Sequence, residues 1–155
     1  MKKLIIPIVQ ILSIGMSFSQ NVQSKNEKMM EMKMNAGILT EKLKESRKFY
    51  SDVLNFEVTF ENEFYLLMHT PDQKARISFL LPNHPTQQPL FHAPFKGEGM
   101  YLTIEVDDVD ALYEKIKNKT DIAIELRDEP WGDRHFAIVD PNGIGIDLVK
   151  YTAPE

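Results

Sequence analysis

The residues with the greatest capacity for chemistry lie close together near the end of the chain, in the stretch DEPWGDRHFAIVDPNGIGIDLVK over residues 128–150. It holds the only tryptophan, Trp131, the adjacent pair Arg134 and His135, and Asp147 within an apolar run. A carboxylate and an imidazole can bind a metal ion or transfer a proton, and an indole can stack on a planar ligand. The stretch therefore indicates a catalytic metal site, a ligand-binding cleft, or simply a β-hairpin.

The hairpin is the best-specified local structure in the sequence. Residues 140–143, Asp-Pro-Asn-Gly, favour a type I turn followed by a bulge, with Gly143 where a positive φ is needed. Two strands must meet at this turn. Because side chains alternate along a strand, Arg134 and His135 point to opposite sides, so one of them faces a cleft and the other faces away.

Composition excludes several classes of function. The chain has 155 residues, of which 43% are hydrophobic and 26% charged, as expected for one soluble globular domain. It contains no cysteine, which excludes disulfides, thiolate metal sites and cysteine nucleophiles. Its net charge of −5 argues against nucleic acid as a partner, because phosphate binding needs a basic face.

The first 19 residues have the layout of a secretory signal peptide, with two lysines, an apolar segment and small residues before Gln20. Pro7 and Gln10 interrupt an apolar segment that is short for a membrane span, so a retained anchor is the weaker alternative. We expect cleavage after Ser19, a periplasmic or secreted protein, and no membrane attachment afterwards.

Residues 20–34 are predicted to form a disordered linker, because they are polar and charged apart from four methionines. A methionine cluster that binds a soft metal such as Cu(I) is an alternative interpretation. Translation could also start at Met29, Met30 or Met34, which would make the protein cytoplasmic.

From residue 35 to 152 the sequence predicts an α+β domain built from one βαβββ unit written twice, with an offset of 66 residues. The first copy comprises a strand over 35–40, a helix over 41–56 and strands over 57–61, 64–70 and 75–81. The second comprises a strand over 101–106, a helix over 107–118 capped by Asp107 or Asp108, and strands over 122–126, 134–140 and 144–150. A proline-rich connector over residues 81–99 joins the two copies.

This layout, together with SRKFYSDVLNFEV, VDDVDALYEKIK and the hairpin stretch, resembles the vicinal oxygen chelate superfamily, which includes glyoxalase I, extradiol dioxygenases and bleomycin-resistance proteins. The final hairpin is most similar to that of the bleomycin-resistance type, with Pro-Trp-Gly, then Arg and Phe, then Asp-Pro and Gly. The resemblance implies two βαβββ modules that form a curved mixed sheet around a U-shaped cleft, with helices on the outer face. It also implies a homodimer whose clefts combine modules from both chains.

Metal-dependent members of the superfamily carry their ligands on the first and last strands of each module. The resemblance places these positions at Asn35, Ser78, Tyr101 and Asp147, and only Asp147 is a strong ligand for zinc, iron, nickel or manganese. We therefore expect no functional metal and no cofactor. A divalent metal held weakly at Asp147 is the alternative.

Alternation along the strands adds Arg76, Thr103 and Glu105 to the residues that face the cleft. Glu105 and Asp147 suit a cationic or hydrogen-bond-donating ligand, whereas Arg76 and Arg134 suit an anionic one. Alternatively, Arg76 forms an ion pair with Glu105 or Asp147. Trp131 stacks on a planar ligand or packs at the dimer interface. The candidate ligand-binding residues are therefore Asn35, Arg76, Ser78, Tyr101, Thr103, Glu105, Trp131, Arg134 and Asp147.

Two functions fit this set. In the first, a homodimer binds an aromatic or polycyclic small molecule in its clefts, without metal or catalysis. In the alternative, the protein is a glyoxalase-like lyase or isomerase in which Asp147 acts as a general base or lone metal ligand and Tyr101 as an acid. Nothing in the sequence supplies the donors that would stabilise an enolate, which favours binding.

Overall fold

The repeated unit predicted from the sequence is present as two modules with the same order of elements. The first module contains β1 (Ala36–Leu39), α1 (Leu43–Asp52), β2 (Glu57–Glu61), β3 (Tyr65–His69) and β4 (Arg76–Leu80). The second contains β5 (Tyr101–Glu105), α2 (Val109–Ile116), β6 (Ile122–Asp128), β7 (Arg134–Val139) and β8 (Gly145–Lys150). A short 3-10 helix, η1 (Pro89–Phe91), lies in the connector between them.

These elements come from a computed structural model that describes residues 30 and 32–152, and all of them belong to the unit Lys33–Glu155. The predicted signal peptide over residues 1–19, and the predicted linker apart from residues 30 and 32–34, lie outside the described residues. None of the described helices is long and apolar enough to cross a membrane.

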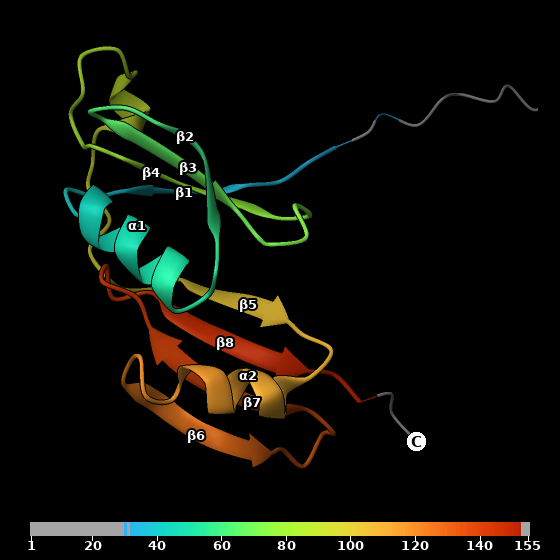
Figure 1. Ribbon diagram of the computed structural model, residues 1–155. Coiled ribbons are helices and arrows are strands. Elements are labelled where there is room, and N and C mark those ends of the chain that lie inside the picture. Colours follow the sequence, from blue (N-terminus) through green and yellow to red (C-terminus); the bar gives the residue numbers. More distant parts are fainter. Residues whose placement is uncertain (1–29, 31, 153–155) are drawn as a thin grey trace, which may run out of the picture. The chain divides into compact units, whose positions relative to one another are not determined.

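Each module forms a four-stranded mixed sheet, in the order β1-β4-β3-β2 or β5-β8-β7-β6 (Figure 1). The first and last strands of each module pair in parallel and the remaining pairs are antiparallel. Ser78 pairs with Gly37, and Asp147 pairs with Thr103, which lies 66 residues after Gly37 (103 − 37 = 66). The register thus confirms that Ser78 and Asp147 occupy equivalent positions in the two modules.

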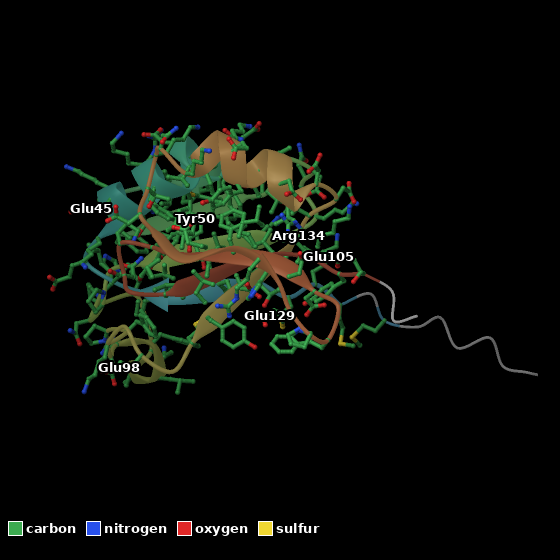
Figure 2. The ribbon with its side chains drawn as sticks, turned by 90° about the horizontal axis from the view of Figure 1, so that it is seen from below. Glu45, Tyr50, Glu98, Glu105, Glu129 and Arg134 are labelled. Carbon is green, nitrogen blue, oxygen red and sulfur yellow. The ribbon has the colours of Figure 1, made fainter. Side chains whose placement is uncertain are left out.

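One face of each sheet carries its helix, and the other face is open. Helix α1 contacts β3 and β4, whereas α2 contacts β7 and β8. Side chains on the helix-bearing faces of both sheets join one hydrophobic core, which includes Ile38 and Phe79 from the first module and Phe136 and Leu148 from the second. Figure 2 shows both helices on the same side of the strands. The opposite faces are therefore the surfaces available to a ligand or a partner.

Helix α1 ends at Asp52, four residues before the end of the predicted helix. Asn55 adopts a positive φ of 56°, and the N–H of Phe56 donates to the carbonyl of Tyr50 over 2.9 Å. The Asn55 N–H donates to the Ser51 carbonyl over 3.1 Å, which is the hydrogen bond of an αL C-cap. The rings of Tyr50 and Phe56 pack edge to face, with centroids 5.4 Å apart, and this contact fixes the turn that leads into β2.

Helix α2 begins as predicted. The Asp108 side chain accepts a hydrogen bond from the N–H of Ala111 over 3.0 Å, so Asp108 rather than Asp107 is the N-cap. The apolar residues Val109 and Ile116 are buried beneath this helix. The helix therefore packs on the second sheet through these apolar residues.

The predicted turn at residues 140–143 is present and also joins the two modules. The Asp140 carboxylate is 4% exposed and accepts hydrogen bonds from the N–H groups of Asn142 and Ile144 and from the Tyr50 hydroxyl over 3.2 Å. The Asn142 side chain contacts Thr40 over 2.7 Å and Ser46 over 3.0 Å. The hairpin that shapes the second sheet is thus anchored to the start and body of α1.

Candidate functional site

The open face of the second sheet presents four of the nine predicted ligand-binding residues. Alternation along β5 leaves Tyr101, Thr103 and Glu105 exposed, whereas Leu102 and Ile104 pack toward the core. Tyr101 is 72% exposed, and Thr103 lies beside Asp147 in the parallel pair of β5 and β8. The structure therefore brings these four residues onto one accessible surface.

His135 of β7 lies at the centre of a polar cluster on this face. Its Nδ1 is 2.7 Å from Oδ1 of Asp147, and its Nε2 is 3.0 Å from Oε1 of Glu129. Arg127 of β6 also binds Glu129, over 2.6 Å. The His135 and Glu129 side chains are only 14% and 10% exposed, whereas Asp147 is 30% exposed. Asp147 is thus the most solvent-accessible of these three side chains, and its carboxylate is hydrogen-bonded to the more deeply buried His135.

This geometry favours the protonated form of His135, because an imidazole donates from both nitrogens only as a cation. Burial on its own would lower the pKa of His135, but hydrogen bonds to Asp147 and Glu129 outweigh it and raise the pKa above its ordinary value. In turn, the hydrogen bond with His135 is the main reason that the pKa of Glu129 is lowered. The two carboxylates and the imidazolium form one coupled ionic group.

Arg134 lies on the opposite face, so the structure resolves the choice between Arg134 and His135. Its guanidinium forms two hydrogen bonds with Asp110 of α2, over 2.9 and 2.7 Å, and one with Asp128 over 3.0 Å. Figure 2 shows Arg134 on the side of the sheet that carries the helices and Glu129 on the other side. Arg134 therefore ties α2 to the sheet and does not line the open face.

Trp131 lies in the loop between β6 and β7. The loop closes through a hydrogen bond from the N–H of Glu129 to the carbonyl of Asp133 over 2.8 Å. The indole Nε1 donates to the Asp133 carboxylate over 2.8 Å, yet the residue remains 67% exposed. Because this loop also carries Glu129, an exposed ring stands at the edge of the face that holds His135.

The predicted residues of the first module are arranged differently. Asn35 is exposed and immediately precedes β1. Ser78 is 7% exposed, and its hydroxyl donates to the carbonyl of Ala36 over 3.4 Å. The side chain of Arg76 is exposed and has no hydrogen bond or ion pair with any described residue. The ion pair of Arg76 with Glu105 or Asp147 is thus not formed in the part of the chain that the structure describes.

A groove of about 730 Å³ runs between the two modules and brings three of the predicted residues together. Its lining includes Arg76 at one side, Thr103 and Glu105 of β5 at the other, and apolar side chains such as Phe56 and Leu102. Tyr101, Trp131 and Asp147 do not line it. The groove therefore adjoins the open face of the second sheet through β5 without containing the His135 cluster.

The donors at the four positions implied by the resemblance do not fit a tight transition-metal site. Asn35, Ser78 and Tyr101 offer an amide, a hydroxyl and a phenol, which are poor ligands beside imidazole or carboxylate. The remaining donor, Asp147, already accepts a hydrogen bond from His135. Across residues 30 and 32–152, no three His, Asp or Glu side chains are placed to hold a metal ion.

Sequence reasoning did not identify the bridge from Asp147 through His135 to Glu129. Part of the signal was present, since the turn at residues 140–143 sets the register of β7 and β8. In that register His135 pairs with Val149 and Ala137 pairs with Asp147, so His135 and Asp147 are diagonal neighbours on one face. Glu129 lies in a loop, and the alternation of side chains along a strand does not specify the path of a loop. The contact between Glu129 and His135 was therefore not predictable from the sequence.

Comparisons with known proteins agree with this fold. A family model for the Glyoxalase/Bleomycin resistance protein/Dioxygenase superfamily matches residues 34–148. A search of curated proteins found no match.

Several solved structures resemble the chain. TnmS3, an antibiotic binding protein from Streptomyces sp. CB03234, has 19% identity and a TM-score of 0.62, with 79% of this chain and 98% of that chain covered. A glyoxalase/bleomycin resistance protein/dioxygenase from Nocardioides has 16% identity and a TM-score of 0.65, with 83% and 89% covered. A superfamily member from Sphaerobacter thermophilus has 21% identity and a TM-score of 0.60, with 78% and 98% covered. At these identities the likeness shows the fold.

Proposed function

Because the chain belongs to the Glyoxalase/Bleomycin resistance protein/Dioxygenase superfamily, we propose that it binds a small aromatic or polycyclic molecule and does so without a metal and without catalysis. The superfamily alone does not decide this, since one scaffold hosts enzymes and binding proteins. The choice rests on the residues that occupy the site.

The observation that carries the proposal is the chemistry of the four positions where metal enzymes of the superfamily place ligands. Three of them hold Asn35, Ser78 and Tyr101, and the fourth, Asp147, is bound to His135 at 2.7 Å. A metal that approached Asp147 would meet the positive charge of a protonated His135 beside its ligand. This arrangement disfavours a catalytic metal and leaves the face available to an organic ligand.

The open face supplies what such a ligand needs. Tyr101 and Trp131 offer exposed rings for stacking, while Thr103, Glu105 and Asp147 offer polar groups that fix orientation. One solved structure with the same fold is that of an antibiotic binding protein, TnmS3. That likeness supports small-molecule binding as the role of this site.

A homodimer would complete the cleft. Each sheet of the described unit has one open face, and large apolar side chains are exposed there or nearby, including Phe60, Tyr101, Trp131, Val139 and Tyr151. Among the described strands, β1 and β5 each pair on one side only, so each sheet of the described unit has a free edge there. A second chain that covers these faces and edges would enclose a ligand between modules of different chains.

Fluorescence of Trp131, the sole tryptophan, tests the proposal directly. We expect saturable quenching by water-soluble planar polycyclic compounds, together with a rise in melting temperature that grows with ligand concentration. The matched variant Trp131→Phe should lose the fluorescence signal but keep a thermal shift. Absence of both signals across a panel of such compounds would refute the proposal.

The competing function is a glyoxalase-like lyase or isomerase that uses Asp147 as base or metal ligand and Tyr101 as acid. It predicts stoichiometric divalent metal in protein purified without chelator, and lactoylglutathione-forming turnover that Asp147→Ala abolishes. Our proposal predicts substoichiometric metal and no turnover with added nickel or zinc.

A further inference from the structure

We propose that the open face of the second sheet binds a planar, positively charged ligand whose charge lies against the carboxylates of Asp147 and Glu105. We also propose that this charge competes with the proton on His135 for the Asp147 carboxylate. This inference rests on the proposed function and specifies the chemical class of its ligand.

The open face presents carboxylate oxygens that have no hydrogen-bond partner among the described residues. Oδ1 of Asp147 is engaged by His135, whereas its Oδ2 has no hydrogen bond to any described residue. The carboxylate of Glu105 likewise has no partner among the described residues. Asp147 pairs with Thr103, and Val149, two residues further along β8, pairs with Glu105. Because side chains two residues apart on a strand share a face, Asp147 and Glu105 lie on the same face of the sheet. Together they present free carboxylate oxygens to a ligand.

The cations nearest to Asp147 are already paired. His135 lies between Asp147 and Glu129, and Arg127, its register partner on β6, binds Glu129. These groups give the face a net charge of −1, from three carboxylates and two cations: Asp147, Glu105, Glu129, protonated His135 and Arg127. Arg76, which has no described partner, lines the adjoining groove together with Glu105, whereas Asp147 does not line that groove. At Asp147 a cation is therefore favoured over an anion.

Exposed rings add to this preference. Tyr101 lies two residues before Thr103 on β5, and Trp131 shares its loop with Glu129. The face of an aromatic ring attracts a cation, so a planar cation gains both stacking and electrostatic energy at such a surface. A planar anion would gain only the stacking.

Competition with the His135 proton follows from the shared carboxylate. The charged groups next to His135 are Asp147 from β8, Glu129 from the loop before β7 and Arg127 from β6. Glu105 of β5 lies on the same face, on the far side of β8. When His135 loses its proton, the face gains one unit of negative charge and Asp147 loses a cationic donor. Cation binding must therefore strengthen as the pH rises through the titration of His135, and binding must release protons at intermediate pH.

The experiment uses ethidium, a planar cation whose charge does not change with pH, and 1-pyrenesulfonate, a planar anion. Isothermal titration calorimetry on the purified protein at low ionic strength should show tighter binding of ethidium than of 1-pyrenesulfonate. Asp147→Asn and Glu105→Gln should each weaken ethidium binding about threefold to tenfold and leave 1-pyrenesulfonate binding unchanged or improved.

Glu98→Gln is the matched control, because it removes the same charge from an exposed connector residue that Figure 2 shows well away from Glu105 and Glu129. It should leave ethidium binding unchanged. If Glu98→Gln weakens ethidium as much as Asp147→Asn does, or if both probes bind equally, the inference is wrong while the proposed function stands. If neither probe nor any neutral polycyclic compound binds, both fail.

The pH dependence separates the competition from simple attraction. Ethidium affinity of the wild type should increase severalfold between pH 6 and 9, whereas His135→Gln should bind ethidium with an affinity that varies little over this range. Calorimetry in buffers of different ionisation enthalpy should detect proton release from the wild type only. A wild-type affinity that falls or stays constant with rising pH would refute the competition. Glu105→Gln replaces an exposed side chain without partners, so it remains informative if His135→Gln does not fold.

Discussion

His135 illustrates how far a single residue could be interpreted from the sequence. Alternation showed that Arg134 and His135 face opposite sides, but it could not choose between them, because a shift of one residue exchanges the two faces. The structure decides through their partners: Arg134 meets Asp110 on α2, and His135 meets Asp147 on the open face.

Stability should depend on pH through His135. Its pKa is raised in the folded protein, so its interactions contribute fully below the unfolded value of about 6.5 and are lost as the pH rises through the folded value. The free energy of unfolding, measured with urea, should therefore differ more between wild type and His135→Gln at pH 6 than at pH 9. An equal difference at both pH values would show that the imidazolium does not stabilise the fold.

Arg134 should matter for stability and not for binding. Arg134→Ala removes three hydrogen bonds between α2, β6 and β7, so we expect a lower melting temperature. Because the side chain lies away from the open face, the affinity for a planar probe should stay within about twofold of the wild type. Loss of binding at unchanged stability would place Arg134 in the site after all.

At the scale of elements, the sequence predicted the order of strands and helices and the turn at residues 140–143, because each depends on local patterns. It could not predict what that turn touches. Asn142 contacts Thr40, a separation of 102 positions, and Tyr50 contacts Asp140 across 90 positions. It also missed the early end of α1, since a positive φ at Asn55 is one of several conformations open to asparagine.

The link between Tyr50 and Asp140 should contribute measurably to stability. Burial, followed by the neighbouring Asp140 charge, raises the pKa of Tyr50 well above its ordinary range, so the hydroxyl remains a donor. Tyr50→Phe should cost about 1–3 kcal/mol in the free energy of unfolding, because a buried carboxylate loses a donor. Tyr65→Phe is a suitable control, since the Tyr65 hydroxyl has no hydrogen bond to a described residue. Equal effects of the two variants would contradict the assigned role.

For the whole molecule, the open faces predict self-association. Size-exclusion chromatography with light scattering should give twice the mass of one chain at micromolar concentration. A monomer at that concentration would mean that each cleft is built from one chain, and would make the groove lined by Arg76 and Glu105 the better candidate for the ligand.

The predicted signal peptide is also a property of the whole chain. Mass spectrometry of protein recovered from the native host should show an N-terminus at Gln20 and an exported protein. A chain that begins at Met29, Met30 or Met34 would instead indicate translation from an internal start and a cytoplasmic protein.

We propose that this member of the superfamily binds its ligand without a metal, because the Asp147 carboxylate is held by His135. The most direct test is a titration of the purified protein with a planar polycyclic probe, followed by Trp131 fluorescence, before and after exhaustive removal of divalent metals. We predict the same dissociation constant in both states. Binding that disappears on metal removal and returns with added nickel or zinc would contradict the claim.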